Sequence, residues 1–272
     1  MSDGGASARE IAPAKLNLAL HVRGRLSDGR HAIETLFAFC VDGDRLSAEP
    51  ADDLSLEIDG PFAADLAGAD NLVIRAAQAL RTSAGVEAGA AIRLKKNLPV
   101  ASGLGGGSAD AAAALRLLTS LWSIDPRHAE QVAPRLGSDV PACLLSMPAR
   151  GTDGGETLTL IGAPEVSGRP VLLVNPRVPL STAAVFAGWG GVDRGPLHDW
   201  RKGRNDLEGP AIALVPQIET MLAWLIAQPG ATLARMSGSG ATCFALFDDE
   251  SARDAAADAV PREWWRLVTE LR

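Results

Sequence analysis

The sequence predicts an α+β fold, and two observations carry that prediction. Alternating strand-like runs and helix-like runs with three- and four-residue spacing both occur, but they interleave without the regular strand–helix–strand order of a doubly wound sheet. The length of 272 residues suits one large domain or two modest ones, and 47% hydrophobic residues are enough for an ordinary soluble core.

The strands are predicted from alternation of apolar and polar residues. In the first, 11–22, Leu16, Leu18 and Leu20 alternate with Lys15 and Asn17. This alternation puts Lys15 and Asn17 on one face of the strand, opposite the leucines. Further strands are expected at 33–40, 54–58, 90–95, 142–147, 170–174 and 242–247.

Four helices are predicted from periodicity and from end signals. The first is expected over 71–83, with Asp70 as its N-cap and Gly85 near its end. An alanine-rich helix is expected over 108–122 and another over 126–136. The last, 210–228, is amphipathic because its apolar residues step by three and four.

Composition excludes several classes of function. The net charge of -7 disfavours a general nucleic-acid or membrane-surface binder. No stretch reaches 18 uninterrupted apolar residues, and residues 1–10 lack the basic start and apolar run of a signal peptide. The three cysteines, Cys40, Cys143 and Cys243, are far apart, which indicates buried thiols rather than a disulfide or zinc site. A reducing cytoplasm fits these features.

The most informative segment is 98–114, which is rich in glycine. Its glycines remove side chains where a backbone must bend tightly around a ligand, and Ser108 then opens a helix. The N–H groups at a helix N-terminus carry positive partial charge, which suits a polyphosphate. The segment therefore predicts an anion-binding loop in an acidic protein.

Three other interpretations of this segment are weaker. A Walker loop requires a lysine after the glycines, and none follows here. A dinucleotide-binding fingerprint would begin with Gly103 and Gly105 but needs a third glycine where this chain has Ser108. Such a fingerprint should also open a strand–helix–strand unit near the N-terminus, and this segment does not. A plain flexible turn between a strand and a buried helix is the remaining alternative.

Residues 99–109 resemble the ATP motif P-x-x-x-G-L-x-x-x-S of the galactokinase, homoserine kinase, mevalonate kinase and phosphomevalonate kinase (GHMP) family. The resemblance implies that the loop wraps the ATP phosphates and that Ser108 lies beside the phosphates and Mg²⁺. It also implies that Asn71, in Asp70-Asn71-Leu72, lies near the adenine pocket. The ATP-binding residues implied in this way are Pro99, Gly103, Leu104, Gly105, Gly106, Gly107, Ser108 and Asn71.

Two further segments resemble the same family and carry its reacting groups. Residues 13–18, Pro-Ala-Lys-Leu-Asn-Leu, contain Lys15, and residues 136–141, Leu-Gly-Ser-Asp-Val-Pro, contain Asp139. Alone, a lysine at a strand start is usually a surface charge, and an aspartate after Gly-Ser is usually a turn residue. The resemblance implies that Asp139 acts as general base toward the substrate hydroxyl, with Lys15 beside it.

The substrate side resembles the branch of the family that acts on cytidyl-diphosphate compounds. There an Asp-Gly-Tyr-His stretch holds the cytosine ring, and this chain has Asp28-Gly29-Arg30-His31. Position 30 departs from the pattern, and the chain contains no tyrosine. The Arg30 guanidinium is also planar, so it either stacks on the base or points to solvent. The substrate-binding residues implied are Asn17, Arg30, His31, Phe37, Thr182 and Phe186.

The resemblance extends from about residue 13 to about residue 247. Residues 204–208 and 235–241 resemble two segments of the family's C-terminal domain. The implied fold has an N-terminal lobe like the second domain of ribosomal protein S5, over 1–161, and a ferredoxin-like C-terminal lobe, over 162–272.

The implied activity is phosphorylation, by ATP with Mg²⁺, of the 2-hydroxyl of a cytidyl-diphosphate derivative of methylerythritol, a step of non-mevalonate isoprenoid synthesis. Another kinase of the same family, such as a homoserine or mevalonate kinase, is the alternative enzyme. A nucleotide-binding oxidoreductase and a non-catalytic nucleotide sensor are alternatives of other classes. Both a monomer and a homodimer are compatible with the sequence.

Overall fold

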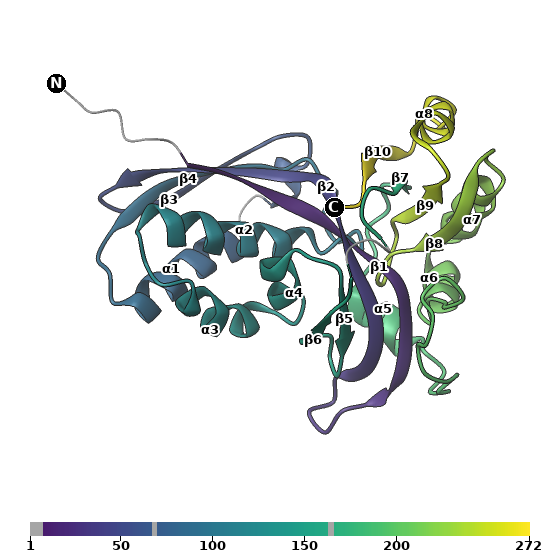
Figure 1. Cartoon of the computed structure of the whole chain (residues 1–272), viewed down its shortest axis with the longest axis horizontal. Helices are drawn as coiled ribbons and strands as arrows, with labels where there is room; N and C mark the ends of the chain where they lie inside the picture. Colours follow the sequence, from purple (N-terminus) through teal and green to yellow (C-terminus); the bar gives the residue numbers. More distant parts are fainter. Residues whose placement is uncertain (1–7, 67–69, 163–165) are drawn as a thin grey trace. The chain divides into compact units, whose positions relative to one another are not determined.

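The computed structural model describes residues 8–66, 70–162 and 166–272 (Figure 1). The chain forms two compact units, and it passes between them several times. The first unit comprises residues up to Ala14, Asp42–Val100 and Gly105–Leu145. The second comprises Lys15–Val41, Ala101–Leu104 and Ser146–Arg272. Two long strands, β1 (Ala8–Arg25) and β2 (His31–Ala51), therefore supply residues to both units.

The first unit packs helices against a sheet. The second half of β2 pairs antiparallel with β4 (Gly89–Lys95), which pairs parallel with β3 (Leu54–Asp59). A short 3₁₀ helix, η1, and helix α1 lie between β3 and β4 along the chain. Figure 1 shows the helices of this unit on one side of these strands. The bounds are η1 Ala63–Leu66, α1 Leu72–Ala84, α2 Gly106–Leu121, α3 Arg127–Leu136 and α4 Val140–Leu145.

Helix α2 is the centre of the first unit because α1, α3 and α4 all pack against it. Its buried stretch is mostly alanine, so neighbouring helices can approach it closely. The buried residues are Ala109, Asp110, Ala111, Ala112, Ala113, Ala114, Leu115, Leu117 and Leu118. One aspartate within this apolar stretch requires a partner, which is described below.

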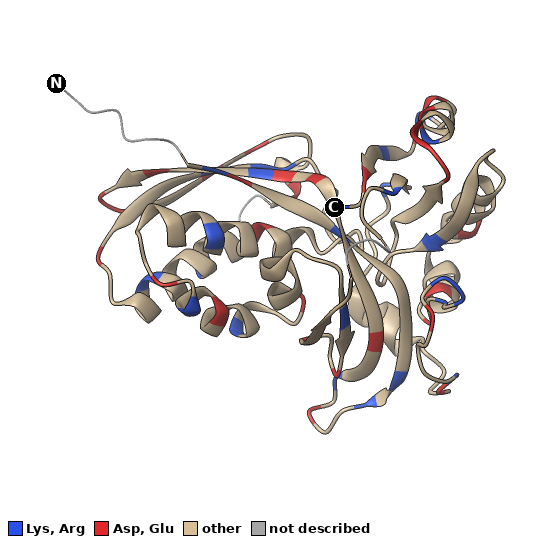
Figure 2. Ribbon diagram, in the orientation of Figure 1, with Lys and Arg blue, Asp and Glu red and all other residues tan. Residues whose placement is uncertain are grey.

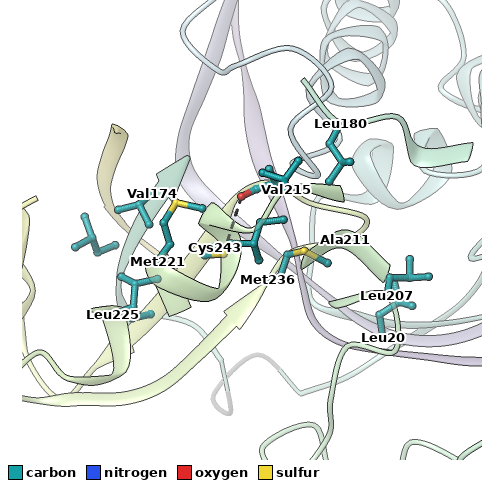
Figure 3. Packing of buried hydrophobic residues seen from close by; sticks show 14 of the residues in the cluster. Leu20, Val174, Leu180, Leu207, Ala211, Val215, Met221, Leu225, Met236 and Cys243 are labelled. Carbon is teal, nitrogen blue, oxygen red and sulfur yellow. Dashed lines mark hydrogen bonds between the residues drawn. The ribbon is translucent and has the colours of Figure 1, made fainter. Parts of the chain in front are cut away.

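The second unit contains a four-stranded antiparallel sheet in the order β10-β7-β9-β8. In addition, Thr35–Phe37 of β2 pair with β5, which pairs with β6. A buried apolar cluster, partly drawn in Figure 3, joins the sheet to helices α6, α7 and α8. The bounds are β5 Ala149–Thr152, β6 Thr157–Leu160, β7 Pro170–Asn175, α5 Thr182–Ala187, α6 Glu208–Leu214, α7 Gln217–Ile226, β8 Ala231–Met236, β9 Cys243–Phe247, α8 Glu250–Asp258 and β10 Trp265–Glu270.

The predicted α+β class is confirmed, but three local predictions are wrong. Residues 140–145 form helix α4 instead of a strand over 142–147, because a short apolar run has no period that separates the two. The helix expected over 210–228 is two helices, since Val215 precedes Pro216 and adopts φ -135° and ψ 84°. The N-cap of α1 is Asn71, not Asp70: its Oδ1 accepts the Val73 N–H at 2.8 Å.

Other bulk predictions can be compared with the described residues. The three cysteines are buried free thiols. None of the helices within 8–66, 70–162 and 166–272 is long and apolar enough to cross a membrane. The prediction that the N-terminus lacks the features of a signal peptide rests on residues 1–10, and residues 1–7 lie outside the described part of the chain. Acidic and basic residues are dispersed over helices and strands of both units (Figure 2).

Candidate active site

Lys15 and Asn17 lie on β1 in the second unit, and both are almost fully buried. Lys15 is 4% exposed, so its charge sits in an enclosed setting and not on a solvated surface. Its Nζ donates a hydrogen bond to Asn17 Oδ1 at 3.0 Å and lies 5.1 Å from the centre of the Phe37 ring. The alternation of the strand thus correctly predicted that Lys15 and Asn17 lie on one face, and β2 brings Phe37 next to them.

Asn17 is fixed by two other segments of the second unit. Its Nδ2 donates to Thr35 Oγ1 at 2.8 Å, and Thr35 Oγ1 donates to the Ala19 carbonyl at 2.6 Å. Its backbone N–H donates to Ser237 Oγ at 3.2 Å. This network leaves the Asn17 amide no freedom to turn, so Lys15 has a fixed acceptor.

The first half of the glycine loop also lies in the second unit. The Lys15 N–H donates to the Leu104 carbonyl at 3.0 Å, and Ser237 Oγ donates to the Gly103 carbonyl at 2.9 Å. Gly103 has φ 80°, and a Cβ there would lie 2.3 Å from the Ser237 carbonyl oxygen. Glycine is therefore required at 103 by its conformation and by the close approach of the 237–240 loop.

The second half of the loop begins helix α2 in the first unit. Gly105 is the helix cap, in the left-handed conformation, and the Ala109 N–H donates to its carbonyl at 2.8 Å. The N–H groups of 106–108 have no acceptor within an α-helix, which gives this end positive partial charge. Gly107 is exposed and Ser108 half-buried, whereas Pro99, at the start of the motif, is buried. A helix end of this kind is a site that suits an anion.

Asn71 lies at the start of α1, close in the fold to the start of α2. A Cβ on Gly107 would be 3.5 Å from Leu72 Cδ1, which places the first turns of the two helices in contact. The Asn71 side chain caps α1 through the Val73 N–H. Its carbonyl oxygen is thus occupied, and its amide nitrogen is the group it can offer to a ligand.

Three charged side chains that the sequence reasoning did not single out lie beneath the glycine loop. Lys96 Nζ is 2.5 Å from Asp44 Oδ2 and 2.7 Å from Asp110 Oδ2. All three side chains are almost completely buried. A signal did exist in the sequence, because Asp110 falls inside an alanine-rich helix that is otherwise apolar.

Asp139 lies in the first unit, in the turn before α4. Its carbonyl accepts the Cys143 N–H at 3.0 Å, and the residue is half-buried. The strand predicted after it is a helix, so Asp139 stands at a helix start, a position that favours a carboxylate. Lys15 belongs to the second unit, and the predicted pairing of Lys15 with Asp139 stays a prediction.

His31 is the centre of an aromatic cluster in the second unit. Its ring stacks on Phe186 with 4.7 Å between centroids, and Trp189 meets it edge-on at 5.5 Å. Its Nε2 is buried and has no hydrogen-bond partner among the described residues. Burial, assisted by the charge of Arg25, lowers the pKa of His31, so the imidazole is neutral at pH 7. Trp189 was missed from sequence, because no motif marks it.

Arg30 and Thr182 have partners at the surface of the same unit. Arg30 Nε donates to Asp28 Oδ2 at 2.7 Å and Nη2 to Glu156 Oε1 at 2.8 Å, and its side chain is 49% exposed. Thr182 is exposed, and its Oγ1 lies 2.9 Å from Ser239 Oγ. Thr182 therefore meets the 237–240 loop, which also contacts Asn17.

The segments 204–208 and 235–241 are joined by one side chain. Asn205 Nδ2 donates to the carbonyls of Met236 at 2.9 Å and Gly238 at 2.7 Å. A Cβ on Gly238 would in turn lie 3.1 Å from the Gly103 carbonyl oxygen. Asn205 thus holds the loop that packs on the first half of the glycine loop.

The chain matches the model of the GHMP kinases N terminal domain over residues 71–147 and that of the GHMP kinases C terminal region over residues 194–267. It is 55% identical to the 4-diphosphocytidyl-2-C-methyl-D-erythritol kinase of Rhizorhabdus wittichii, over 97% of this chain and 94% of that protein. It is 49% identical to the protein of the same name from Novosphingobium aromaticivorans, over 98% and 93% of the two chains.

Solved structures agree with these matches. A crystal structure of 4-(cytidine 5'-diphospho)-2C-methyl-D-erythritol kinase is similar with a TM-score of 0.82 and 33% identity, and the match covers 97% of this chain and 98% of that one. The mevalonate kinase of Methanococcus jannaschii matches with a TM-score of 0.70 at 10% identity over the full length of both chains, which shows a shared fold.

Proposed function

This chain belongs to the GHMP kinase family, and within it to the 4-diphosphocytidyl-2-C-methyl-D-erythritol kinases; on that premise we propose that Lys15 and Asp139 transfer the γ-phosphoryl group of Mg-ATP to the 2-hydroxyl of 4-diphosphocytidyl-2-C-methyl-D-erythritol. The kinase is an enzyme of the non-mevalonate isoprenoid pathway, and ATP is its phosphoryl donor by family.

The observation that carries the proposal is the attachment of Lys15 to the glycine loop. Its backbone bonds the Leu104 carbonyl, and its ammonium is fixed on Asn17. Phosphoryl transfer spreads negative charge over the oxygens of the moving group, and a preorganised cation stabilises that charge. A lysine that is 4% exposed acts in a low-dielectric setting, where its charge is worth more than in water.

The bond changes define the two roles. The oxygen of the substrate 2-hydroxyl forms a bond to the γ-phosphorus, and the bond from that phosphorus to the oxygen bridging the β- and γ-phosphates breaks. The hydroxyl proton passes to Asp139, and ADP leaves with the bridging oxygen. Because the transition state is loose, Asp139 acts mainly by orienting the hydroxyl and accepting its proton late.

Residues Gly103 to Ser108 are proposed to hold the triphosphate. Gly103 and Leu104 are fixed on the Lys15 side by hydrogen bonds. The N–H groups of 106–108 point positive partial charge outward from α2. Asn71 is proposed to contact adenine through its free amide group.

Magnesium is proposed to accompany ATP. The described residues contain no group of three His, Cys, Asp or Glu side chains that could hold a metal ion by themselves. Mg²⁺ in kinases keeps several waters and is held by substrate phosphates with one or two protein ligands, so the half-buried Ser108 hydroxyl at the cradle fits this need. When bound, the ion neutralises phosphate charge.

The cytidyl end of the substrate is proposed to bind at the aromatic cluster. His31 is neutral and has a buried nitrogen without a partner, which suits a hydrogen bond to the edge of a pyrimidine. Phe186 supplies a flat apolar face beside it, and Phe37 lies next to Lys15. Thr182 and Arg30 are proposed to border this region, and Asn17 to contact the sugar alcohol.

The assay that tests the proposal measures both products. Purified protein is incubated with ATP, Mg²⁺ and the cytidyl substrate, and phosphorus NMR follows ADP and the new phosphate monoester. Parallel reactions with homoserine and mevalonate test the alternative kinases. We expect phosphorylation of the cytidyl substrate alone; turnover of homoserine or mevalonate in its place would contradict the assignment. The buried thiols suit a reducing cytoplasm, and both a monomer and a homodimer are compatible with the proposed site.

A further inference from the structure

The second unit contains a cavity that the proposed chemistry does not use. Its volume is about 590 Å³, which lies in the range of sites that bind small molecules. Three segments of the second unit form its wall, 188–194, 203–210 and 234–235. Its charged side chains and its one aromatic ring are Arg194, Arg204, Asp206, Glu208, Arg235 and Trp189.

Two of these charged side chains hold the wall together. Asp206 is buried, with its side chain 1% exposed, and its Oδ2 accepts the Val22 N–H at 2.9 Å. Arg204 Nε donates to Asp206 Oδ1 at 2.6 Å, and Arg204 Nη2 lies 3.3 Å from the Gly195 carbonyl oxygen. Asp206 and Arg204 therefore compensate each other, and the other charges of the cavity remain for a ligand.

Arg235 and Glu208 are opposite charges that line the cavity without forming an ion pair with each other. Arg235 is 7% exposed, and its Nη1 donates to the carbonyls of Leu18 and, at 2.9 Å, Trp200. Its Nε and Nη2 donate to none of the described residues. Glu208 is half-buried and accepts the Met236 N–H. Each side chain is thus anchored on the main chain, which keeps the two charges apart.

This separation is unfavourable unless something lies between the two groups. A charge taken out of water needs a close partner and further hydrogen bonds to compensate for its burial. Burial raises the pKa of Glu208, and the Met236 N–H and the charge of Arg235 oppose the rise. Burial likewise lowers the pKa of Arg235, although a guanidinium stays charged. A ligand that accepts hydrogen bonds from Arg235 and donates one to Glu208 would compensate both groups.

The hydrogen-bonding edge of cytosine has this combination of groups. Its N3 and O2 atoms are acceptors, which suit the planar donors of a guanidinium, and its N4 amino group is a donor of the kind that a glutamate accepts. Uracil has a carbonyl oxygen in place of that amino group, and this oxygen would face the Glu208 carboxylate. Trp189 adds a ring on which a base can stack.

Arg194 gives the cavity a group for a phosphate. Its side chain is 62% exposed, and its contact with Asp206 Oδ1 is long, at 3.4 Å. An exposed guanidinium that is weakly held can turn to a phosphate and bind it in a bidentate manner. The cavity is lined by three guanidinium groups and two carboxylates, so its excess charge is positive and favours an anionic ligand.

We propose that this cavity is a second nucleotide site of the enzyme and that it binds a cytidine nucleotide. Arg235 and Glu208 contact the edge of the cytosine, Trp189 contacts its face, and Arg194 holds the phosphate. The site is separate from the His31 cluster, although Trp189 meets His31 edge-on and borders both. The inference rests on the proposed function, because it takes the His31 cluster as the place where the substrate's own base binds.

The experiment counts cytidine monophosphate (CMP) molecules per chain by calorimetry and compares CMP with uridine monophosphate (UMP). The variants Glu208→Gln and Arg194→Gln alter the cavity, and Phe186→Ala alters the proposed substrate site. The control is Arg201→Gln: Arg201 lies 4.7 Å from the centre of the Trp200 ring and does not line the cavity. Each protein is first checked for folding by thermal melting.

We expect two CMP molecules per chain in the wild type and in Arg201→Gln. Phe186→Ala should weaken one of them by about 5- to 150-fold and leave the other, which should bind CMP at least about fivefold more tightly than UMP. Glu208→Gln and Arg194→Gln should weaken only the CMP that Phe186→Ala leaves, by at least about threefold. KM for the cytidyl substrate should stay within about twofold of wild type in Arg194→Gln.

A single CMP per chain, which Phe186→Ala weakens and Glu208→Gln and Arg194→Gln do not, would overturn the proposal. Equal affinity for CMP and UMP in Phe186→Ala would do so too, as would a large rise in KM for the cytidyl substrate in Arg194→Gln, which would assign the cavity to the substrate site. If Glu208→Gln does not fold, the exposed Arg194 and the comparison of CMP with UMP decide. Two CMP sites in a protein that does not phosphorylate the cytidyl substrate would instead contradict the proposed function.

Discussion

The backbone N–H of Lys15 donates a hydrogen bond to the Leu104 carbonyl at 3.0 Å. Two segments that are about ninety residues apart in sequence are thereby held in fixed register, and Leu104 lies within the residues that match the GHMP kinases N terminal domain. The bond is made by the main chain, so a substitution of the Lys15 side chain leaves it intact. This allows the ammonium to be removed without moving the loop.

Lys15→Met is predicted to lower kcat by at least about 100-fold, the scale found when one preorganised charge-stabilising group is removed. Methionine has a similar length and no charge, and it retains contact with the Phe37 ring. The dissociation constant for ATP should change little, because the loop keeps its position. Steady-state kinetics and calorimetry measure the two quantities. A tenfold loss of ATP affinity with normal kcat would show that Lys15 binds nucleotide instead.

Asp139→Asn is predicted to lower kcat by at least about 100-fold, the lower limit for a positioned general base. Asparagine keeps the backbone bond to the Cys143 N–H, so α4 should remain in place. ATP affinity and the melting temperature should both stay close to those of the wild type. The control is Ser138→Ala at the neighbouring exposed position. A near-normal kcat for Asp139→Asn would remove this carboxylate from the mechanism.

Two glycines of the loop should respond differently to the same substitution. At Gly103, with φ 80°, an alanine Cβ would collide with the Ser237 carbonyl, so Gly103→Ala should lower the free energy of unfolding by roughly 1–3 kcal/mol. At Gly107 the Cβ would only touch Leu72 at 3.5 Å, and alanine favours the helix. Gly107→Ala should therefore be as stable as wild type but should raise KM for ATP, because the methyl group stands at the cradle.

Denaturant unfolding and ATP kinetics on this pair separate structure from binding. If Gly107→Ala keeps the wild-type KM for ATP, the ATP phosphates bind at another place. Wild-type stability in Gly103→Ala would mean that the 237–240 loop moves aside easily.

The sequence was sufficient for the class of fold and for most residues on which the chemistry is proposed to depend, because those residues lie in contiguous motifs. Lys15 beside Asn17 follows from strand alternation alone. Sequence was insufficient where long-range packing decides. The Lys96 cluster joins residues 44, 96 and 110, and Trp189 meets His31 across more than 150 residues of chain. Neither arrangement has a local period or motif.

Local errors had local causes. The break between α6 and α7 arises at Val215 because Pro216 follows it. The prediction of a single helix gave more weight to the spacing of apolar residues than to this proline. The helix at 140–145 contains only apolar residues after Asp139, and such a short run fits a strand equally well. The division of the chain at residue 161 stays a prediction.

The stability of Asp110→Asn relative to wild type is predicted to depend on pH. The folded protein raises the pKa of Asp110 from 3.8 to about 7, chiefly by burial. The bound proton therefore stabilises the folded state fully below pH about 4, and this contribution is lost as the pH rises through about 7. Asparagine lacks this dependence. The melting temperature of Asp110→Asn minus that of wild type should increase from pH about 5 to about 8. A constant difference would mean that Asp110 does not titrate in this range.

The last prediction concerns the proposed cytidyl site, where Arg30 stands at the position that is tyrosine in the Asp-Gly-Tyr-His pattern this segment resembles. The guanidinium is held at the surface by Asp28 and Glu156, with its side chain 49% exposed. Exposed ion pairs are worth about 0–1 kcal/mol, so they do not by themselves prevent the side chain from turning onto a base. Flat faces are already present beside His31, however, in Phe186 and Trp189.

Stacking of a base on an aromatic ring is worth roughly 1–3 kcal/mol by alanine substitution, which is about 5- to 150-fold in KM. We therefore predict that Phe186→Ala and Trp189→Ala each raise KM for the cytidyl substrate within this range, with KM for ATP unchanged. Arg30→Ala should raise it less than about fivefold. If Arg30→Ala falls within the larger range, and Arg30→Tyr restores the loss, then the guanidinium leaves its carboxylates and stacks on cytosine. In that case a flat face at position 30 is what specificity for the base requires.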